Sequence, residues 1–298
     1  MKILNFGSLN VDHVYEMEHF VRPGETLSSD KLTLTCGGKG LNQSVALARA
    51  GAAVWHAGKL GADGAMLRDR LAENGVELSC LMVGDCPTGH AIIQVDRSGQ
   101  NCIILFGGAN RAITEGEVDE VLARFDSGDI LLLQNEISCL GYLLEKAGEK
   151  GMRIALNPSP IDDTLTALPG LRHVKWFIMN EIEGEQLTGA AQPDEIVRRM
   201  HEKYPESDVV LTLGKRGALW TDGVRTVRHG IYDVRPVDTT AAGDTFTGFF
   251  LASVARGDSP ERAMELASRA SSISVGRPGA SDSIPTLDEV ETAELTAL

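Results

Sequence analysis

Asp244 lies in a segment of small residues whose spacing suggests phosphoryl-transfer chemistry. The segment runs Asp238-Thr-Thr-Ala-Ala-Gly-Asp-Thr-Phe-Thr-Gly248 and leads into a helix that we expect to begin near Gly243. The first turn of a helix leaves backbone N–H groups unpaired, so it can hold an anion. An acid beside that anion makes chemical sense if it takes a proton from a nucleophile attacking a bound phosphoryl group. An ordinary capped helix start is the alternative for this segment alone.

Further polar residues follow the predicted strands and could bind a hydroxyl-rich ligand. Asn10 and Asp12 come directly after the first strand and can grip vicinal hydroxyls, although an Asx turn would use the same residues. The glycines of segment 37–40 let backbone N–H groups approach a ligand, and Lys39 and Asn42 can add polar contacts. A tight turn is the alternative for this cluster.

Two more polar clusters favour a nucleotide. Asn180 and Glu183 are one helical turn apart and share a face, where they could orient waters on Mg²⁺. A solvated helix start would look the same. The run Thr212–Gly217 could cradle phosphates, but it could equally be a βαβ-type turn or a hairpin.

The elements expected around these residues alternate between strand and helix. Short apolar runs predict strands at 2–9, 53–59, 129–134, 152–156, 176–179 and 208–213. Helical patterns include 41–49, 64–74, 114–125 and 138–150, the third opened by a Thr114-x-x-Glu117 capping box. Alternation with fully apolar strands predicts a mostly parallel sheet covered by helices on both faces. Ligands bind such sheets beyond the carboxyl ends of the strands, where the polar clusters fall.

Two stretches interrupt that alternation. Residues 13–35 are polar, and residues 88–106 alternate around a turn at Asp96-Arg-Ser-Gly99. Both indicate antiparallel strands outside the main sheet, and they could pair into one small sheet over the active face. Separate surface excursions are the alternative.

Composition excludes several other classes of protein. The chain has 298 residues, 43% hydrophobic content and a formal charge of −14, so a general nucleic-acid binder is not expected. Five cysteines without metal-ligand spacing indicate reduced thiols. The first residues read as a strand and no apolar run could span a membrane, so we expect a cytoplasmic protein. A Walker A loop, a GxGxxG turn and an HExxH helix are all absent.

Together these segments resemble the ribokinase (PfkB-type) family of carbohydrate kinases over nearly the whole chain. Gly7–Asp12, Pro23–Thr26 and Gly37–Asn42 match its N-terminal signature, and Asp238–Gly248 matches its C-terminal signature. The resemblance implies an α/β, ribokinase-like fold in a single domain, 1–298, with a β lid near 13–35 and 88–108. It implies an ATP-dependent kinase that uses Mg²⁺ and K⁺ and phosphorylates the primary hydroxyl of a sugar, most simply D-ribose at O5. Another furanose, a nucleoside, a sugar acid or a non-catalytic sensor are the alternatives.

The resemblance also implies roles for individual residues. Asp244 resembles the catalytic base, and the backbone N–H groups of Ala242, Gly243 and Asp244 resemble the anion hole for the transferring phosphoryl group. Ala241, next to them, belongs to the same catalytic segment. Sugar-binding positions correspond to Asn10, Asp12, Gly38, Lys39, Gly40, Asn42 and Glu136. Nucleotide and Mg²⁺ positions correspond to Asn180, Glu183, Thr212, Gly214, Lys215, Gly217, Gly243 and Ser268. A monovalent-cation site, built mostly from backbone carbonyls, corresponds to Asp238, Thr240, Ser274, Arg277, Gly279 and Ser283.

Three departures from the family pattern bear on these expectations. Ala241 replaces a frequent glycine, which is harmless if its φ is negative. Leu41 replaces a smaller residue and could narrow the sugar pocket. Ser268 stands where an asparagine often lies near the adenine. The lid of such kinases commonly forms the contact of a homodimer, so the resemblance implies a dimer as well.

Overall fold

A nine-stranded sheet forms the centre of the molecule. The computed structural model describes residues 1–298, and its strands lie in the order β13-β12-β11-β10-β9-β8-β1-β4-β5. All neighbours are parallel except β11–β12 and β12–β13, which are antiparallel, so the predicted mostly parallel sheet is confirmed. The strands are β1 Ile3–Phe6, β4 Val54–Leu60, β5 Leu81–Val83, β8 Ile130–Gln134, β9 Arg153–Asn157, β10 Val174–Asn180, β11 Asp208–Thr212, β12 Ala218–Thr221 and β13 Thr226–His229.

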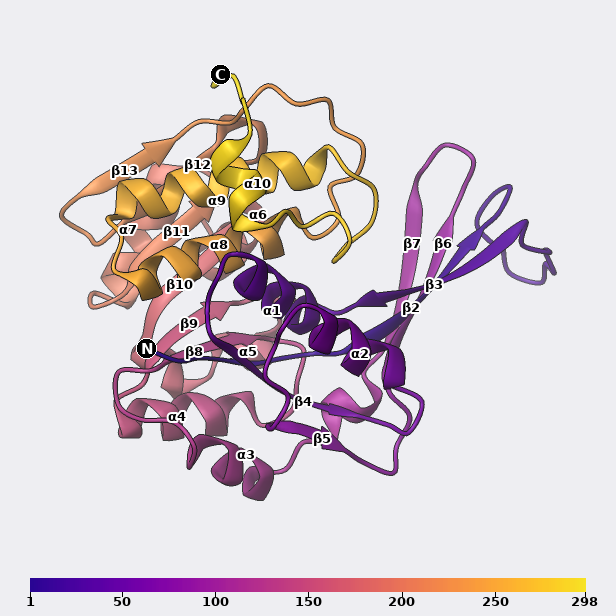
Figure 1. Ribbon diagram of the computed structural model, residues 1–298, viewed down its shortest axis with the longest axis horizontal. Helices are drawn as coiled ribbons and strands as arrows, with labels where there is room; N and C mark the ends of the chain where they lie inside the picture. Colours follow the sequence, from indigo (N-terminus) through magenta and orange to yellow (C-terminus); the bar gives the residue numbers. More distant parts are fainter.

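Helices cover both faces of this sheet (Figure 1). Because strand side chains alternate, Ile3 joins one core cluster and its neighbour Leu4 joins the other. The first face carries α1 Lys39–Arg49, α2 Ala65–Glu73, α8 Ala242–Arg256, α9 Pro260–Val275 and α10 Leu287–Thr292. The second carries α3 Glu115–Leu122, α4 Leu140–Lys150, α5 Asp163–Thr166, α6 Glu181–Thr188 and α7 Pro193–Lys203. The predicted capping box at Thr114 is present at the start of α3.

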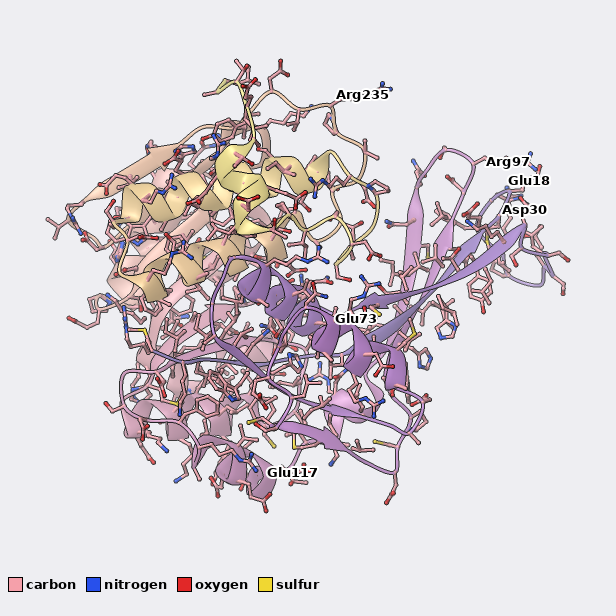
Figure 2. All side chains as sticks on the ribbon, in the orientation of Figure 1. Glu18, Asp30, Glu73, Arg97, Glu117 and Arg235 are labelled. Atoms are coloured by element: carbon pink, nitrogen blue, oxygen red, sulfur yellow. The ribbon has the colours of Figure 1, made fainter.

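A separate four-stranded sheet, here called the small sheet, has the order β3-β2-β6-β7 and projects from the layered body (Figure 1). Its strands are β2 Asn10–Glu16, β3 Lys31–Gly37, β6 Gly89–Val95 and β7 Asn101–Phe106. Glu18, Asp30 and Arg97 mark its far end (Figure 2). The two distant stretches therefore pair as predicted. The expectation of antiparallel strands is wrong at the join, because β2 and β6 run parallel.

Close packing of α1 against α8 brings two polar helix starts together. A Cβ built on Gly248 would lie 2.3 Å from Cβ of Ala46 and 2.8 Å from the backbone nitrogen of Leu47. Only a glycine permits this approach, because real Cβ atoms do not come so near a neighbour. The first turns of both helices consequently face the same edge of the sheet.

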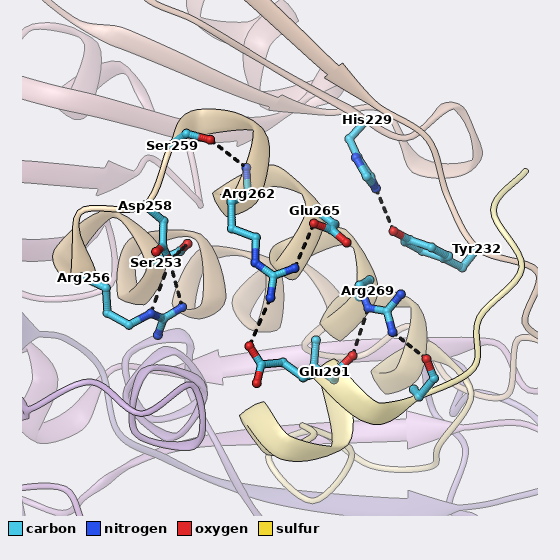
Figure 3. Close-up of polar contacts among 12 residues, drawn as sticks. His229, Tyr232, Ser253, Arg256, Asp258, Ser259, Arg262, Glu265, Arg269 and Glu291 are labelled. Carbon is cyan, nitrogen blue, oxygen red and sulfur yellow. Dashed lines mark hydrogen bonds and ion pairs between the residues drawn. The ribbon is translucent and has the colours of Figure 1, made fainter.

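The C-terminal segment is tied to α9 by arginine side chains (Figure 3). Arg262 pairs with Glu265 and with Glu291 of α10. Arg269 donates to the backbone oxygens of Val290 and Ala293 at 2.9 and 2.6 Å. These contacts fix α10 and the residues that follow it against α9. All five cysteines are free, and none of the helices has the length and apolar character needed to cross a membrane.

Candidate active site

The first turn of α8 is open to a ligand. The helix begins at Ala242, and the Ala242 N–H donates to the carbonyl of Thr239 at 3.2 Å. The N–H groups of Gly243 and Asp244 have no backbone acceptor. They lie in the first turn of a 15-residue helix, where the dipole favours negative charge. The structure therefore leaves two of the three expected donors available, and Ala242 is already engaged.

Ala241 does not meet the condition under which its replacement of glycine would be harmless. Its φ is +59°, in the left-handed region, rather than negative. The carbonyl of Ala241 accepts both the N–H and the hydroxyl of Thr245, each at 2.8 Å. A non-glycine residue in this region costs about 1–2 kcal/mol. The start of α8 thus holds local strain beside the open N–H groups.

Asp244 is held by amide donors on both of its carboxylate oxygens. Nδ2 of Asn42 lies 3.1 Å from Oδ2, and Nε2 of Gln43 lies 2.8 Å from Oδ1. Asp244 itself is only 8% exposed. The carboxylate is therefore oriented before any ligand binds, and an ordinary helix cap does not explain its contacts, because they come from another helix.

A pocket of about 230 Å³ opens over this carboxylate. It brings together residues predicted for the base, for the sugar-binding segment 37–42 (here called the sugar loop) and for the nucleotide, which are far apart in sequence. A phosphate group fits this setting because free N–H groups and a lysine converge there. The lining residues are Lys39, Asn157, Ile178, Met179, Asn180, Glu183, Thr212, Thr239, Ala241, Ala242, Gly243, Asp244 and Thr247.

Lys39 supplies positive charge to the pocket and stays protonated. Burial alone would lower the pKa of Lys39, but the nearby carboxylates of Asp244, Glu136 and Glu183 raise it above its ordinary value. The lysine thus stands among three acids contributed by α8, the end of β8 and α6. The charge of Lys39 can therefore offset the negative charge of these carboxylates and of a phosphate bound in the pocket.

The sugar-side residues gather where the small sheet meets the main sheet. Oδ1 of Asn10 accepts from Asn110 at 2.9 Å, and the Glu136 carboxylate accepts from the Ser8 hydroxyl and from the Lys39 N–H at 3.2 Å. Burial, together with the charge of Glu136, raises the pKa of Asp12 to about 7. Gly37 and Gly40 have no room for a side chain, and Gly38 has a φ of +94°.

Leu41 does not narrow this region as we expected. Its side chain has no exposed surface and belongs to the core between the sheet and the first layer of helices. Its N–H donates to the carbonyl of Ser8 at 3.0 Å. The Leu41 side chain therefore points into the core, where it anchors the sugar loop, and not into the sugar pocket.

The nucleotide-side residues divide into two groups. Asn180 and Glu183 form a reciprocal capping box at the start of α6, with both hydrogen bonds at 2.9 Å, and they line the pocket together with Thr212. One oxygen of the Glu183 carboxylate accepts from the Asn180 N–H, and the other could accept a hydrogen bond from a water bound to Mg²⁺, an ion that needs few protein ligands. Gly214, Lys215 and Gly217 lie in the hairpin between β11 and β12, outside the pocket lining. Ser268 is buried in α9, also outside it.

The residues expected around a monovalent cation come together from two segments. The Asp238 carboxylate accepts from the Thr240 N–H at 2.9 Å and from the Gly279 N–H at 3.0 Å. The hydroxyls of Ser274 and Ser283 are 2.7 Å apart. The Arg277 side chain pairs with Glu289, so only its backbone is available to a cation.

Several buried amides that were not predicted as site residues lie beneath the pocket. Gln43, Gln134 and Asn5 are completely buried, and Asn157 is 9% exposed. A signal for them exists in the strands, because Ile130, Leu132 and Gln134 share one face and the last of these is polar. Ile3 and Asn5 follow the same pattern. A polar residue that ends an apolar strand face at the carboxyl edge of the sheet is therefore the signal that such amides give in the sequence.

Comparison with known proteins places this site in context. Residues 1–287 match the model of the pfkB family of carbohydrate kinases. The ribokinase of Haemophilus influenzae is 36% identical over 297 residues, covering 95% of each protein. Two solved structures are similar over 97% of the chain: a Cryptococcus neoformans ribokinase with ADP (34% identity, TM-score 0.85, 98% of that chain) and an Arabidopsis thaliana ribokinase with ribose and ATP (28% identity, TM-score 0.84, 97% of that chain).

Proposed function

The chain belongs to the pfkB family of carbohydrate kinases, and we propose that it transfers the γ-phosphoryl group of ATP to the primary hydroxyl of D-ribose, giving D-ribose 5-phosphate. Family membership makes it a phosphotransferase with an alcohol group as acceptor. The choice of ribose follows the relatives, because a ribokinase is 36% identical over nearly the full length of both chains.

One observation carries the mechanism. Asp244 and the open N–H groups of Gly243 and Asp244 belong to the same helix turn and line one pocket, which also holds Lys39. A resting anion next to a carboxylate would be repelled, whereas a base next to a transferring phosphoryl group is required. We therefore assign Asp244 as the general base.

In the proposed reaction, the sugar hydroxyl gives its proton to Asp244 as its oxygen attacks the γ-phosphorus. The new O–P bond forms while the bond to the bridging oxygen of ADP breaks, and ADP leaves with the electron pair. The helix N–H groups and Lys39 stabilise the charge that spreads over the phosphoryl oxygens. Bound Mg²⁺ would neutralise phosphate charge, and Asn180 and Glu183 would orient its waters.

The remaining residues take supporting roles in the proposal. Asn10 and Asp12 bind sugar hydroxyls, and the 37–42 loop with Glu136 closes that side. Asp238, Thr240 and the backbone of segment 274–283 would hold K⁺, which would fix the shape of the anion hole. The small sheet, defined above, closes over the sugar to exclude water and also forms the contact of a homodimer. We place the protein in the cytoplasm, where ATP is available and its cysteines stay reduced.

A coupled assay of ADP release tests the function. The purified protein is screened against ribose, 2-deoxyribose, hexoses, sugar acids and nucleosides, with K⁺ or with an equal ionic strength of a bulky organic cation. We expect the highest kcat/KM with ribose, and a higher rate in K⁺. Clear preference for another acceptor would replace the substrate assignment, and the absence of turnover on every acceptor would favour a sensor.

A further inference from the structure

A continuous line of buried hydrogen bonds runs from Asp244 into the core of the sheet. Gln43 Nε2 donates to Asp244, and Gln43 Oε1 accepts from Gln134 Nε2 at 2.6 Å. Gln134 Nε2 also donates to Asn5 Oδ1 at 3.0 Å. Gln43, Gln134 and Asn5 come from α1, β8 and β1, and each is completely buried. None of them can touch a ligand in the pocket.

The partners of each amide determine which way it points. Asn5 uses both N–H groups, donating to the carbonyl of Gly40 at 2.7 Å and to Ser44 at 2.8 Å, so its oxygen must face Gln134. Gln134 then donates its two N–H groups to the side-chain oxygens of Asn5 and Gln43. Gln43 accepts with its oxygen and must therefore present its nitrogen to Asp244.

The inner end of the line carries no charge. Ser44 accepts from Asn5 and shares a hydrogen bond of 2.8 Å with Nδ1 of His56. His56 is completely buried, and burial lowers its pKa to about 3, so the ring is neutral at physiological pH. Apart from Asp244, the line therefore has no ionised member that could disturb the orientation of its amides.

This arrangement is costly as a purely structural feature. Oε1 of Gln134 is buried without a hydrogen-bond partner. An unpaired buried polar group costs about 1–3 kcal/mol, and replacing both members of a buried pair by apolar groups of the same shape can be nearly neutral. A core of apolar side chains would thus serve stability equally well. Stability therefore does not explain the line of amides, whereas its hydrogen bond to the Asp244 carboxylate does.

We propose that Gln43 and Gln134 are positioning residues for Asp244: Gln134 orients the Gln43 amide, and Gln43 holds the carboxylate towards the acceptor hydroxyl. The inference rests on the proposed role of Asp244 as the base. Gln43 also donates to Asn157 at 3.3 Å, so both of its N–H groups are committed and the amide cannot rotate freely. The carboxylate is fixed from one side by Gln43 and from the other by Asn42.

The test uses Gln43→Met and Gln134→Met, which keep the side-chain length but remove the amide, and the double variant. We expect Gln43→Met to lower kcat by about 10- to 100-fold, as for a misplaced catalytic group, with KM for ribose and ATP unchanged. Gln134→Met should lower kcat less. In the Gln43→Met background it should have no further effect, because its influence passes through Gln43.

A matched control is Ser207→Ala, which removes a buried hydrogen bond to the Val174 carbonyl, 2.6 Å long, without any link to Asp244. It should lower Tm and leave kcat unchanged. The inference is wrong if Gln43→Met keeps wild-type kcat. It is also wrong if the losses of kcat in the two single variants are additive in the double variant and are proportional to the losses of Tm. If Gln43→Met does not fold, Gln134→Met is compared with Ser207→Ala under conditions in which both have lost the same Tm. A lower kcat for Gln134→Met than for Ser207→Ala supports the inference, and equal kcat values contradict it. Wild-type protein without turnover on any acceptor would instead refute the proposed function.

Discussion

Nδ2 of Asn42 lies 3.1 Å from Oδ2 of Asp244, although 202 positions of sequence separate the two residues. The contact joins the first turn of α1, next to the sugar loop, to the first turn of α8. Both helix starts are held together by the close approach at Gly248. The distance between the acceptor site and the base is therefore set by helix packing, which makes catalysis sensitive to substitutions away from the pocket.

Replacing Asp244 by Asn should lower kcat by about 10² or more, because the general base is lost. Binding of ribose, measured by calorimetry, should be largely retained. The new amide would face the N–H groups of Asn42 and Gln43 and can accept with only one oxygen, so a small loss of Tm is also expected. Near-normal turnover of this variant would refute the assignment of the base.

Asp12 should make stability depend on pH. Its pKa is 3.8 in the absence of the fold and about 7 within it, so the folded protein binds more protons between these values. The stability that Asp12 contributes is therefore fully present below about pH 4 and is lost as pH rises to about 7. In thermal melts, the Tm of Asp12→Asn minus that of the wild type should increase over this window and then level off.

Glu25 provides a control of opposite sign. A hydrogen bond from the backbone of Arg22 and another from His19 lower its pKa below the ordinary 4.5. Its contribution is present above that value and is lost as pH falls. Glu25→Gln should consequently reduce Tm at neutral pH and lose this effect in acid. The same pH trend for both variants would contradict the assigned causes.

Ala241→Gly should relieve the backbone strain at the start of α8. The left-handed conformation costs an alanine about 1–2 kcal/mol, and the greater freedom of an unfolded glycine offsets about 0.5–1 kcal/mol of the gain. We expect unfolding in urea to show a net stabilisation of up to about 1 kcal/mol. Gly257→Ala is the reciprocal control, since Gly257 ends α8 with a φ of +87° and open space around it. That variant should be destabilised, and a stabilised Gly257→Ala would contradict the argument.

Gly248→Ala should separate α1 from α8 and so disturb the contact between Asn42 and Asp244. The added methyl group would meet the backbone of Leu47, and overpacking of this kind costs about 1–3 kcal/mol. Both Tm and kcat should fall. Gly116→Ala is the control within another helix, because nothing lies within 4 Å of its Cβ position. It should gain up to about 1 kcal/mol and keep full activity.

The small sheet offers a direct test of the proposed dimer. Leu34, His13, Ile92 and Ile104 form one row across its four strands, and the outer two are 51% and 58% exposed. Exposed apolar side chains gathered on one surface, such as Leu34 and Ile104, mark contact surfaces. Leu34→Asp combined with Ile104→Asp should halve the molar mass measured by light scattering. Val224→Asp, a substitution at an exposed turn away from the small sheet, should leave the mass unchanged. A monomeric wild type would exclude the dimer.

Local patterns in the sequence were sufficient for the elements and for the outline of the site. Apolar runs predicted the parallel strands because a strand covered on both faces must be apolar throughout. Glycine and acid at 243 and 244 marked the open helix start, since those features are encoded by adjacent residues. Asn180 and Glu183 were placed correctly at the start of α6 for the same reason.

The conformation of Ala241, the inward turn of Leu41 and the parallel join of β2 to β6 were not predictable, because each depends on partners distant in the chain. The same holds for Gln43, whose amide looks like any other in a helix, whereas Gln134 is marked in the sequence as the polar end of an apolar strand face. By itself the sequence determined which residues could carry phosphoryl transfer and which edge of the sheet would gather them. Only the tertiary structure decided how the Asp244 carboxylate is oriented, because hydrogen bonds across three elements exist only once the helices and strands have packed.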